Sequence, residues 1–186
     1  MKKLILLFAM ALVMQSCYVT IEIPPCMNGN LTPEQTNSIC WLSDTTSLIG
    51  LDNDDCIYAI NSNQMKDLLI AKDRTIVYRW LHYDMKNNIP IYFVQSYCDE
   101  NNIELYVITN EYTAAFAEID NVKNPIFSMN IGDCMINVEN KLEDKFYKEL
   151  FGNKYKKKFH IYYLENGEFV RTEDEMMNEK WKKKWE

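Results

Sequence analysis

Residues 75–102 decide the fold of this chain, and they read TIVYRWLHYDMKNNIPIYFVQSYCDENN. The first part, TIVYRWL, is rich in β-branched and aromatic residues and predicts a buried strand. The last part, IPIYFVQSYCDENN, places Ile91, Val94 and Cys98 at i, i+3 and i+7, which predicts a helix with one buried face. The polar segment HYDMKNN is therefore expected to be the loop at the end of a strand, where α/β proteins often bind ligands.

The alternation of strands and helices continues in both directions from this stretch. Strands are predicted over residues 55–60, 103–112 and 124–131, and helices over 64–72, 111–119 and 141–152. Asn61 or Ser62 can cap the first of these helices, and Gly152 stands where the last one should stop. Strands that alternate with helices of this length imply crossover connections and a mainly parallel sheet. We therefore expect an α/β fold.

The C-terminal part departs from this alternation. Residues 157–172, KKFHIYYLENGEFVRT, contain two β-rich runs joined by Asn166-Gly167. This dipeptide is typical of a type I′ hairpin turn, which needs positive φ at both central residues. A capping box of Thr172 and Glu175 then predicts a last helix, which carries a methionine and two tryptophans four residues apart. The sheet should therefore end in an antiparallel hairpin followed by a helix.

The N-terminus has the pattern of a bacterial lipoprotein signal. Two lysines precede an apolar run from Leu4 to Met14, and MQSC then places a small residue before Cys17. This junction resembles a lipobox, which predicts removal of residues 1–16 and attachment of acyl chains to Cys17. The alternative is an ordinary cleaved signal peptide that leaves Cys17 as a free thiol. A retained transmembrane helix is disfavoured, because the apolar run is too short to span a bilayer.

The mature chain is expected to be acidic. The full chain has a net charge of −7, and removal of Lys2 and Lys3 with the signal peptide would change this to −9. Such a charge argues against nucleic acid as a partner. By the sorting rule of Gram-negative lipoproteins, Tyr18 in place of an aspartate after the lipidated cysteine predicts the outer membrane of the cell envelope. The expected organisation is a signal peptide (1–16), a lipidated N-terminus with an irregular tether (17–54) and one domain (55–186).

Five cysteines remain beyond Cys17, and export would place them where disulfides persist. The shortest separations are Cys26 to Cys40 and Cys40 to Cys56, and both fit a structural disulfide better than a redox pair. Of these we name Cys26 and Cys40 as the possible disulfide. The sequence has no CxxC motif, and its two histidines are isolated, so we expect no metal site.

The predicted order of elements over residues 56–186 resembles the thioredoxin fold, in the form found in the exported, TlpA-like thiol–disulfide interchange family. The resemblance rests on the apolar strand that ends at Trp80, on the NG hairpin in FHIYYLENGEFV, and on the amphipathic last helix. It implies a central, mainly parallel sheet with a C-terminal antiparallel hairpin, flanked by helices.

The resemblance also implies where an active site would lie, and the residues there depart from the family. The family's reactive cysteine pair would fall at Asp84 and Asn87. The facing loop, where the family has a cis-proline, would include Lys157 and Lys158. Dithiol exchange needs a low-pKa thiolate and a resolving partner, and the loop offers neither. The degenerate active-site loop consists of His82, Asp84, Lys86 and Asn87.

These observations predict a membrane-anchored lipoprotein whose redox-inactive, thioredoxin-like domain is a binding or scaffold module. No cofactor is expected, and the partner would be a protein or a small anionic ligand held at the loop end of the sheet. The alternative is an atypical thiol oxidoreductase or peroxidase that uses Cys98 or Cys134. Because Cys98 lies on the helix face of Ile91 and Val94, we expect it to be a buried side chain rather than a reactive thiol.

Overall fold

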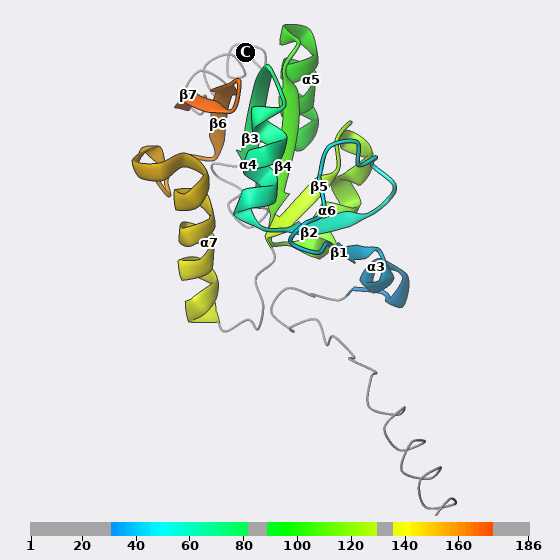
Figure 1. The fold of residues 1–186 in the computed structure, drawn as a ribbon. Coiled ribbons are helices and arrows are strands. Elements are labelled where there is room, and N and C mark those ends of the chain that lie inside the picture. Colours follow the sequence, from blue (N-terminus) through cyan, green and yellow to red (C-terminus); the bar gives the residue numbers. More distant parts are fainter. Residues whose placement is uncertain (1–30, 82–88, 130–135, 173–186) are drawn as a thin grey trace, which may run out of the picture.

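The computed structural model describes residues 31–81, 89–129 and 136–172. Within them, seven strands form one sheet in the order β1-β2-β5-β4-β3-β6-β7 (Figure 1). The strands are β1 Ile39–Trp41, β2 Ile57–Ile60, β3 Arg74–Arg79, β4 Glu104–Thr109, β5 Ile126–Met129, β6 Ile161–Glu165 and β7 Glu168–Thr172. β1 to β5 run parallel, whereas β6 is antiparallel to β3 and β7 is antiparallel to β6. The predicted α/β class is confirmed, in an arrangement consistent with a thioredoxin-like layout.

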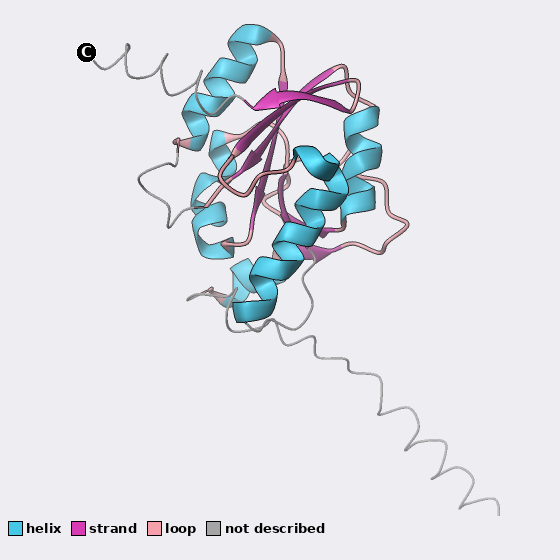
Figure 2. Cartoon of the chain, turned by 90° about the vertical axis from the view of Figure 1, so that its left-hand side faces the viewer, coloured by secondary structure: helices cyan, strands magenta, loops and turns pink. Residues whose placement is uncertain are grey.

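Helices cover both faces of the sheet (Figure 2). They are α3 Pro33–Asn37, α4 Ser62–Ile70, α5 Ile91–Asn101, α6 Tyr112–Glu118 and α7 Ile136–Phe151, with two 3-10 turns, η1 Ile119–Asn121 and η2 Gly152–Lys154. Crossovers between parallel strands are right-handed. The chain crosses the sheet in one direction from β2 to β3 and then turns back from β3 to its neighbour β4. The two crossover helices, α4 and α5, therefore lie on opposite faces. α4 contacts α7 on one face, and α5 contacts η1 on the other.

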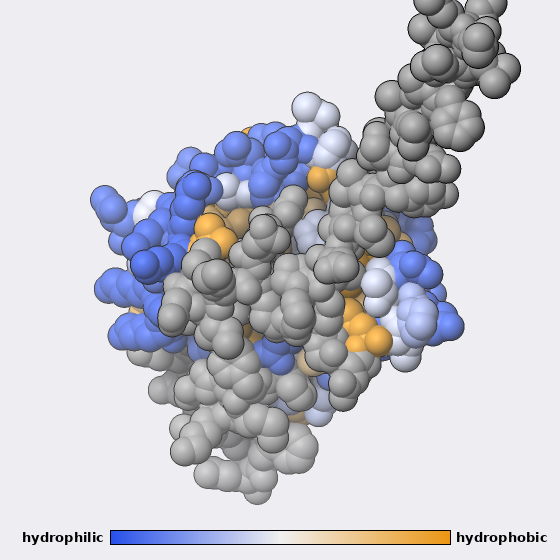
Figure 3. Space-filling view, turned by 90° about the horizontal axis from the view of Figure 1, so that it is seen from below, coloured by the Kyte–Doolittle hydropathy of each residue, from blue (hydrophilic) through white to orange (hydrophobic). Residues whose placement is uncertain are grey.

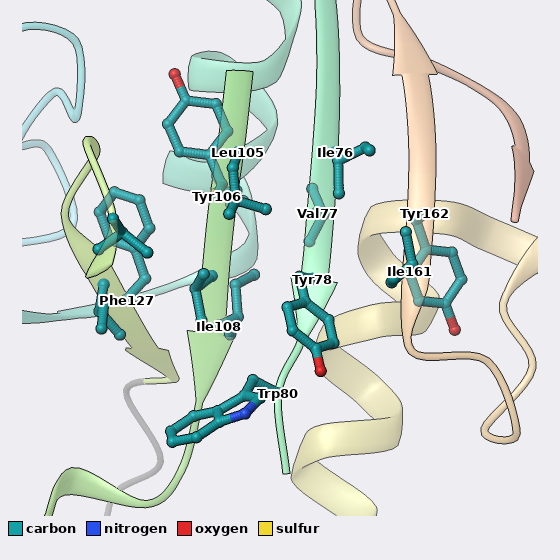
Figure 4. Close-up of a cluster of buried hydrophobic side chains, with 14 of the residues drawn as sticks. Ile76, Val77, Tyr78, Trp80, Leu105, Tyr106, Ile108, Phe127, Ile161 and Tyr162 are labelled. Carbon is teal, nitrogen blue, oxygen red and sulfur yellow. The ribbon is translucent and has the colours of Figure 1, made fainter. Parts of the chain in front are cut away.

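The centre of the sheet is a fully buried apolar layer. Ile76, Val77 and Tyr78 of β3 have no exposed surface, and the facing side chains of β4, β5 and β6 are also buried (Figure 4). A strand that is buried on both faces has a continuous apolar sequence rather than an alternating one. This is the reason that TIVYRWL could be predicted as a strand. Each large aliphatic side chain buried here contributes about 1.5–3 kcal/mol to folding.

Aromatic rings join α7 to β6. The rings of Phe151 and Tyr162 stack with centroids 4.2 Å apart and an interplanar angle of 11°. Tyr147 stacks on Tyr155 at 5.5 Å and 13°. Such pairs add about 0.5–1.5 kcal/mol beyond the area they bury. The stack therefore fixes α7, and the chain that follows it, against the antiparallel end of the sheet.

The hairpin between β6 and β7 has the predicted turn. Asn166 and Gly167 have φ values of 51° and 76°, both positive as a type I′ turn requires. The Asn166 N–H donates to the Asp73 carbonyl at 2.8 Å, so the turn is held against the start of β3. Further along the hairpin, the pairing of the two strands shifts register between Tyr163 and Leu164.

The start of α4 confirms the predicted cap at Asn61. Its side chain accepts a hydrogen bond from the Gln64 N–H at 2.9 Å, and the Gln64 side chain accepts one from the Asn61 N–H at 2.9 Å. This reciprocal arrangement is a capping box, which satisfies two backbone donors that a helix start otherwise leaves unpaired. The α5 prediction also holds, since Ile91, Val94 and Cys98 are all buried.

The segment before residue 55 differs from the irregular tether that the sequence predicts. It contains α3, and β1 pairs with β2 in parallel to form one edge of the sheet. β1 spans only three residues, Ile-Cys-Trp, which is too short for an alternating pattern to be visible. Thr32 and Gln35 form a capping box for α3 within a turn-rich sequence. The sheet therefore begins about fifteen residues earlier than expected.

Several predictions lie outside the described residues: the signal peptide, the lipidated Cys17 and the last helix. Among the residues that the structure does describe, no helix is long and apolar enough to cross a membrane.

Candidate functional site

The predicted loop end of the sheet is the edge where the carboxyl ends of β1 to β5 lie. At this edge β3 ends at Arg79, and Trp80 and Leu81, which follow, are buried. Figure 4 shows Trp80 below the ends of β3 and β4. The predicted loop residues His82, Asp84, Lys86 and Asn87 come next and lie outside the described residues. The site is therefore built from the described side chains around the two ends of this loop.

Tyr78 fixes the point at which the chain returns from the loop. Its hydroxyl donates to the Ile89 carbonyl at 2.6 Å and accepts from the Ile89 N–H at 3.0 Å, and the contact is buried. On the other side of the loop, the Trp80 N–H donates to the Ile108 carbonyl at 2.9 Å. Both ends of the loop are thus fixed at the sheet edge by buried hydrogen bonds.

Arg79 connects three elements at this edge. Its side chain points to the opposite face from Tyr78, as successive residues of a strand do. There its Nε donates to the carboxylate of Glu143 on α7, and its Nη1 donates to the Lys157 carbonyl at 3.0 Å. The guanidinium also lies 5.8 Å from the centre of the Tyr147 ring. One buried cation therefore joins the end of β3, helix α7 and the loop that precedes β6.

The guanidinium of Arg79 is charged, and the tyrosines around it are neutral. Burial lowers the pKa of Arg79, but the hydrogen bond and the negative charge of Glu143 outweigh burial and raise that pKa above its usual value. Burial is the main cause that raises the pKa of Tyr147 and that of Tyr155. The ion pair of Arg79 and Glu143 thus lies among aromatic side chains, and it fixes the geometry of this edge of the sheet.

The facing loop lies directly beside the end of β3. The Arg79 N–H donates to the His160 carbonyl at 2.7 Å, and the Tyr162 hydroxyl donates to the Lys156 carbonyl at 3.0 Å. While this backbone is held in place, the side chains of Lys156, Lys157 and Lys158 are exposed. Seen from below, the described surface is mainly hydrophilic with small apolar areas (Figure 3). The structure therefore presents a rigid loop with outward-facing ammonium groups.

Two of these lysines carry charges that no described acidic group pairs with. Among the described residues, neither Lys156 nor Lys158 forms an ion pair, and the Lys158 Nζ lies 4.8 Å from the centre of the Phe159 ring. The nearby acids are already engaged, because Glu143 pairs with Arg79 and Asp144 accepts from the Tyr155 hydroxyl at 3.0 Å. Lys156 and Lys158 thus present two exposed ammonium groups at this loop.

Two buried polar atoms belong to residues beside this edge of the sheet. Among the described residues, the Asn110 Oδ1, which follows the end of β4, and the Tyr147 hydroxyl have no hydrogen-bond partner. Most buried polar groups in proteins are hydrogen-bonded, and the exceptions often have a role or contact an ordered water. The Asn110 Oδ1 can therefore accept a further hydrogen bond, and the Tyr147 hydroxyl can donate or accept one.

The opposite, amino edge of the sheet has a hollow of about 550 Å³ with polar walls. Four of its charged side chains form ion pairs, since Lys72 lies 2.9 Å from Glu104 and Lys123 lies 2.7 Å from Asp99. Cys98 also borders this hollow, but it is fully buried, and burial raises the pKa of its thiol to about 12. Since the thiolate is the reactive form, Cys98 is poorly suited to thiol exchange.

The remaining predicted residues are placed as follows. The Sγ of Cys40 lies 2.9 Å from that of Cys56, whereas Cys26 and Cys134 are outside the described residues. His160 is buried at the start of β6. Within the described ranges, no group of three or more His, Cys, Asp or Glu side chains is placed to hold a metal ion.

No protein-family model, no curated protein and no solved structure matches this chain. The resemblance to the thiol–disulfide interchange family therefore stays a prediction.

Sequence reasoning missed Tyr78, Arg79 and Glu143, which organise the site. The only signal was Arg79 itself, a charge inside the apolar run TIVYRWL, because a buried charge requires a partner. The identity of that partner, 64 residues away, follows only from the fold.

Proposed function

We propose that this protein is a membrane-anchored lipoprotein of the bacterial cell envelope whose α/β domain is a binding or scaffold module. Its contact surface is the loop end of the sheet, and its ligand is an acidic segment of a partner protein or a small anion. The anchor is supported by the sequence around Cys17, and the contact surface by the geometry of the described residues.

One observation carries the proposal for the contact surface. The basic loop 154–158 is held near its C-terminal end by the Arg79 hydrogen bond to the Lys157 carbonyl, and the side chains of Lys156 and Lys158 are exposed. A positive surface on a rigid backbone attracts anions and limits the ordering cost of binding.

A thiol-based enzyme finds less support. Cys98 is buried at the amino edge of the sheet, and its raised thiol pKa disfavours the thiolate. A binding module needs only a fixed surface, which the edge around Arg79 supplies.

The test measures binding of a fluorescein-labelled decaglutamate peptide to the mature protein by fluorescence anisotropy. We expect binding that weakens as salt is raised, because salt screens exposed charges. The double variant Lys156→Glu/Lys158→Glu should weaken binding at least tenfold. The matched control, Lys72→Glu/Lys123→Glu, makes the same charge change at the opposite edge and should change binding less than twofold.

Two results would contradict this surface: no binding by the unaltered protein, or equal weakening by both double variants. Inorganic pyrophosphate as a competitor separates the two classes of ligand. If it displaces the peptide at micromolar concentration, the surface suits a small anion. If only longer acidic peptides compete, an acidic protein segment is the better match.

A further inference from the structure

Cys40 and Cys56 lie side by side at the β1 edge of the sheet. Cys40 is the middle residue of β1, and Cys56 directly precedes β2. The two strands are in parallel register there, and the Ile57 N–H donates to the Ser38 carbonyl at 3.0 Å. The Sγ atoms are 2.9 Å apart, about 0.9 Å more than the bonded separation of two sulfurs. The backbone pairing therefore brings the two thiols together in the native fold.

The pair is also accessible. Both cysteines are partly exposed, unlike Cys98. Both residues therefore have surface exposed to an oxidant in solution.

We propose that Cys40 and Cys56 form a disulfide bond that fastens β1 and residues 41–55 to the edge of the sheet. The oxidant is a small disulfide, such as oxidised glutathione, or an oxidised dithiol protein. Two S–H bonds of the protein and the S–S bond of the oxidant break, and one S–S bond forms in the protein. The protein loses two electrons and two protons, and the oxidant leaves as two thiols.

The surroundings make this bond a structural one. Burial raises the pKa of the Cys56 thiol to about 11, and the hydrogen bond and charge of Cys40 add to this effect, followed by the charges of Asp54 and Asp55. Exchange catalysts have the opposite property, a thiol pKa below the usual value. Because the thiolate is disfavoured here, the bond should be slow to exchange once it has formed.

Residues 41–55, which the bond would close into a loop, also form hydrogen bonds with other parts of the fold. The Gln64 side-chain amide donates to the Ser43 carbonyl at 2.9 Å and to the Thr46 carbonyl at 3.0 Å, at the start of α4. The Asn53 amide donates to the Ile119 and Val122 carbonyls, both at 3.0 Å, beside η1. A bond between residues 40 and 56 therefore ties the start of α4 and the η1 turn to the β1 edge.

This proposal excludes the Cys26–Cys40 disulfide that the sequence suggested, because Cys40 can form only one such bond. Spacing alone allowed both pairings, although Cys26–Cys40 was the one expected from the sequence. The position of Cys40 beside Cys56 favours the second.

The test is disulfide mapping of the mature, full-length protein by mass spectrometry after trapping free thiols with N-ethylmaleimide at low pH. Trypsin cannot separate the cysteines, because no lysine or arginine lies between residues 4 and 65. A protease that cuts after acidic residues can, since Glu34 lies between Cys26 and Cys40, and Asp44 lies between Cys40 and Cys56. We expect a linked pair of peptides that contain Cys40 and Cys56. A Cys26–Cys40 link, or alkylation of both Cys40 and Cys56, would overturn the proposal.

A thermal measurement provides the second readout. Addition of a strong reductant should lower the melting temperature by about 6–12 °C, the shift expected when a loop of this length is opened in a domain of this size. The double variant Cys40→Ala/Cys56→Ala should melt at the lower temperature and lose its response to reductant. The control variant Cys98→Ala should keep that response. A melting temperature that does not respond to reductant in the unaltered protein would count against the bond.

Discussion

The guanidinium of Arg79 and the carboxylate of Glu143 meet inside the protein and join the last residue of β3 to helix α7. Their side chains are 3% and 5% exposed. A buried pair of this kind adds little over an apolar replacement, but removal of one partner leaves the other charge buried and alone. The integrity of the loop end therefore depends on both residues being present.

The first prediction concerns this pair. Glu143→Gln keeps the size of the side chain and removes its charge, and it should lower the free energy of unfolding by about 3–5 kcal/mol. Urea denaturation measures the change. The double variant Arg79→Met/Glu143→Leu should recover most of the loss. As a control on the same helix, Lys145→Gln breaks the exposed pair with Glu149 and should cost less than about 1 kcal/mol. Equal losses for Glu143→Gln and Lys145→Gln would contradict this account.

The second prediction concerns the hairpin turn. A Cβ atom at Gly167 would lie 2.8 Å from the Ile70 Cα, and the residue has a φ of +76°. Gly167→Ala should therefore lower the free energy of unfolding by about 2–4 kcal/mol, through backbone strain and the clash together. Gly50→Ala is the matched control, because φ there is +84° but no atom lies within 4 Å of the added Cβ. It should cost only about 1 kcal/mol. If the two variants unfold at the same urea concentration, the Cβ added at residue 167 does not clash with Ile70 of α4.

The third prediction concerns alkaline pH. The pKa of the buried Cys98 thiol is raised to about 12, whereas in the unfolded chain it is near 8.5. Above pH 8.5 the unfolded thiol loses its proton while the native thiol keeps it, so rising pH favours unfolding. This one group should remove about 1.4 kcal/mol of stability per pH unit until pH approaches 12.

Unfolding measured between pH 8.5 and 9.5 tests this, because unfolded tyrosines have a pKa of about 10 and are still largely protonated there. Cys98→Ala should be less stable at pH 7, because it leaves a small cavity, yet its stability should fall less steeply with pH. If the unaltered protein and Cys98→Ala lose the same free energy of unfolding per pH unit, Cys98 does not titrate as its burial implies.

The fourth prediction concerns the membrane anchor. If Cys17 carries acyl chains, radiolabelled palmitate should enter the protein, and Cys17→Ala should move it from the membrane fraction to the soluble fraction. Cys26→Ala is the control and should leave both labelling and fractionation unchanged. A Cys17→Ala protein that stays on the membrane would contradict the lipoprotein interpretation.

Much of the fold could be predicted from the sequence, because local patterns determine it. TIVYRWL has the continuous apolar character of a strand buried on both faces, and Asn166-Gly167 has the conformational freedom that its turn requires. The cap at Asn61 is likewise a short-range feature.

The remaining features depend on contacts between distant parts of the chain. β1 is a strand because Ile39–Trp41 lies against β2, although three residues carry no pattern of their own. The choice of Cys56 over Cys26 as the neighbour of Cys40 follows from that pairing. The site depends on Arg79 meeting Glu143, and only the position of α7 reveals this partner.

The two outermost strands of the sheet also bear on how this protein can associate. β1 is very short, and β7 carries exposed charges at Glu168 and Arg171 beside a shift in its pairing with β6. Short edge strands, edge charges and irregular pairing all discourage a foreign strand from extending a sheet. Copies of the chain at high local concentration should therefore resist aggregation through their sheet edges. Recognition of a partner is then left to side chains rather than to backbone pairing.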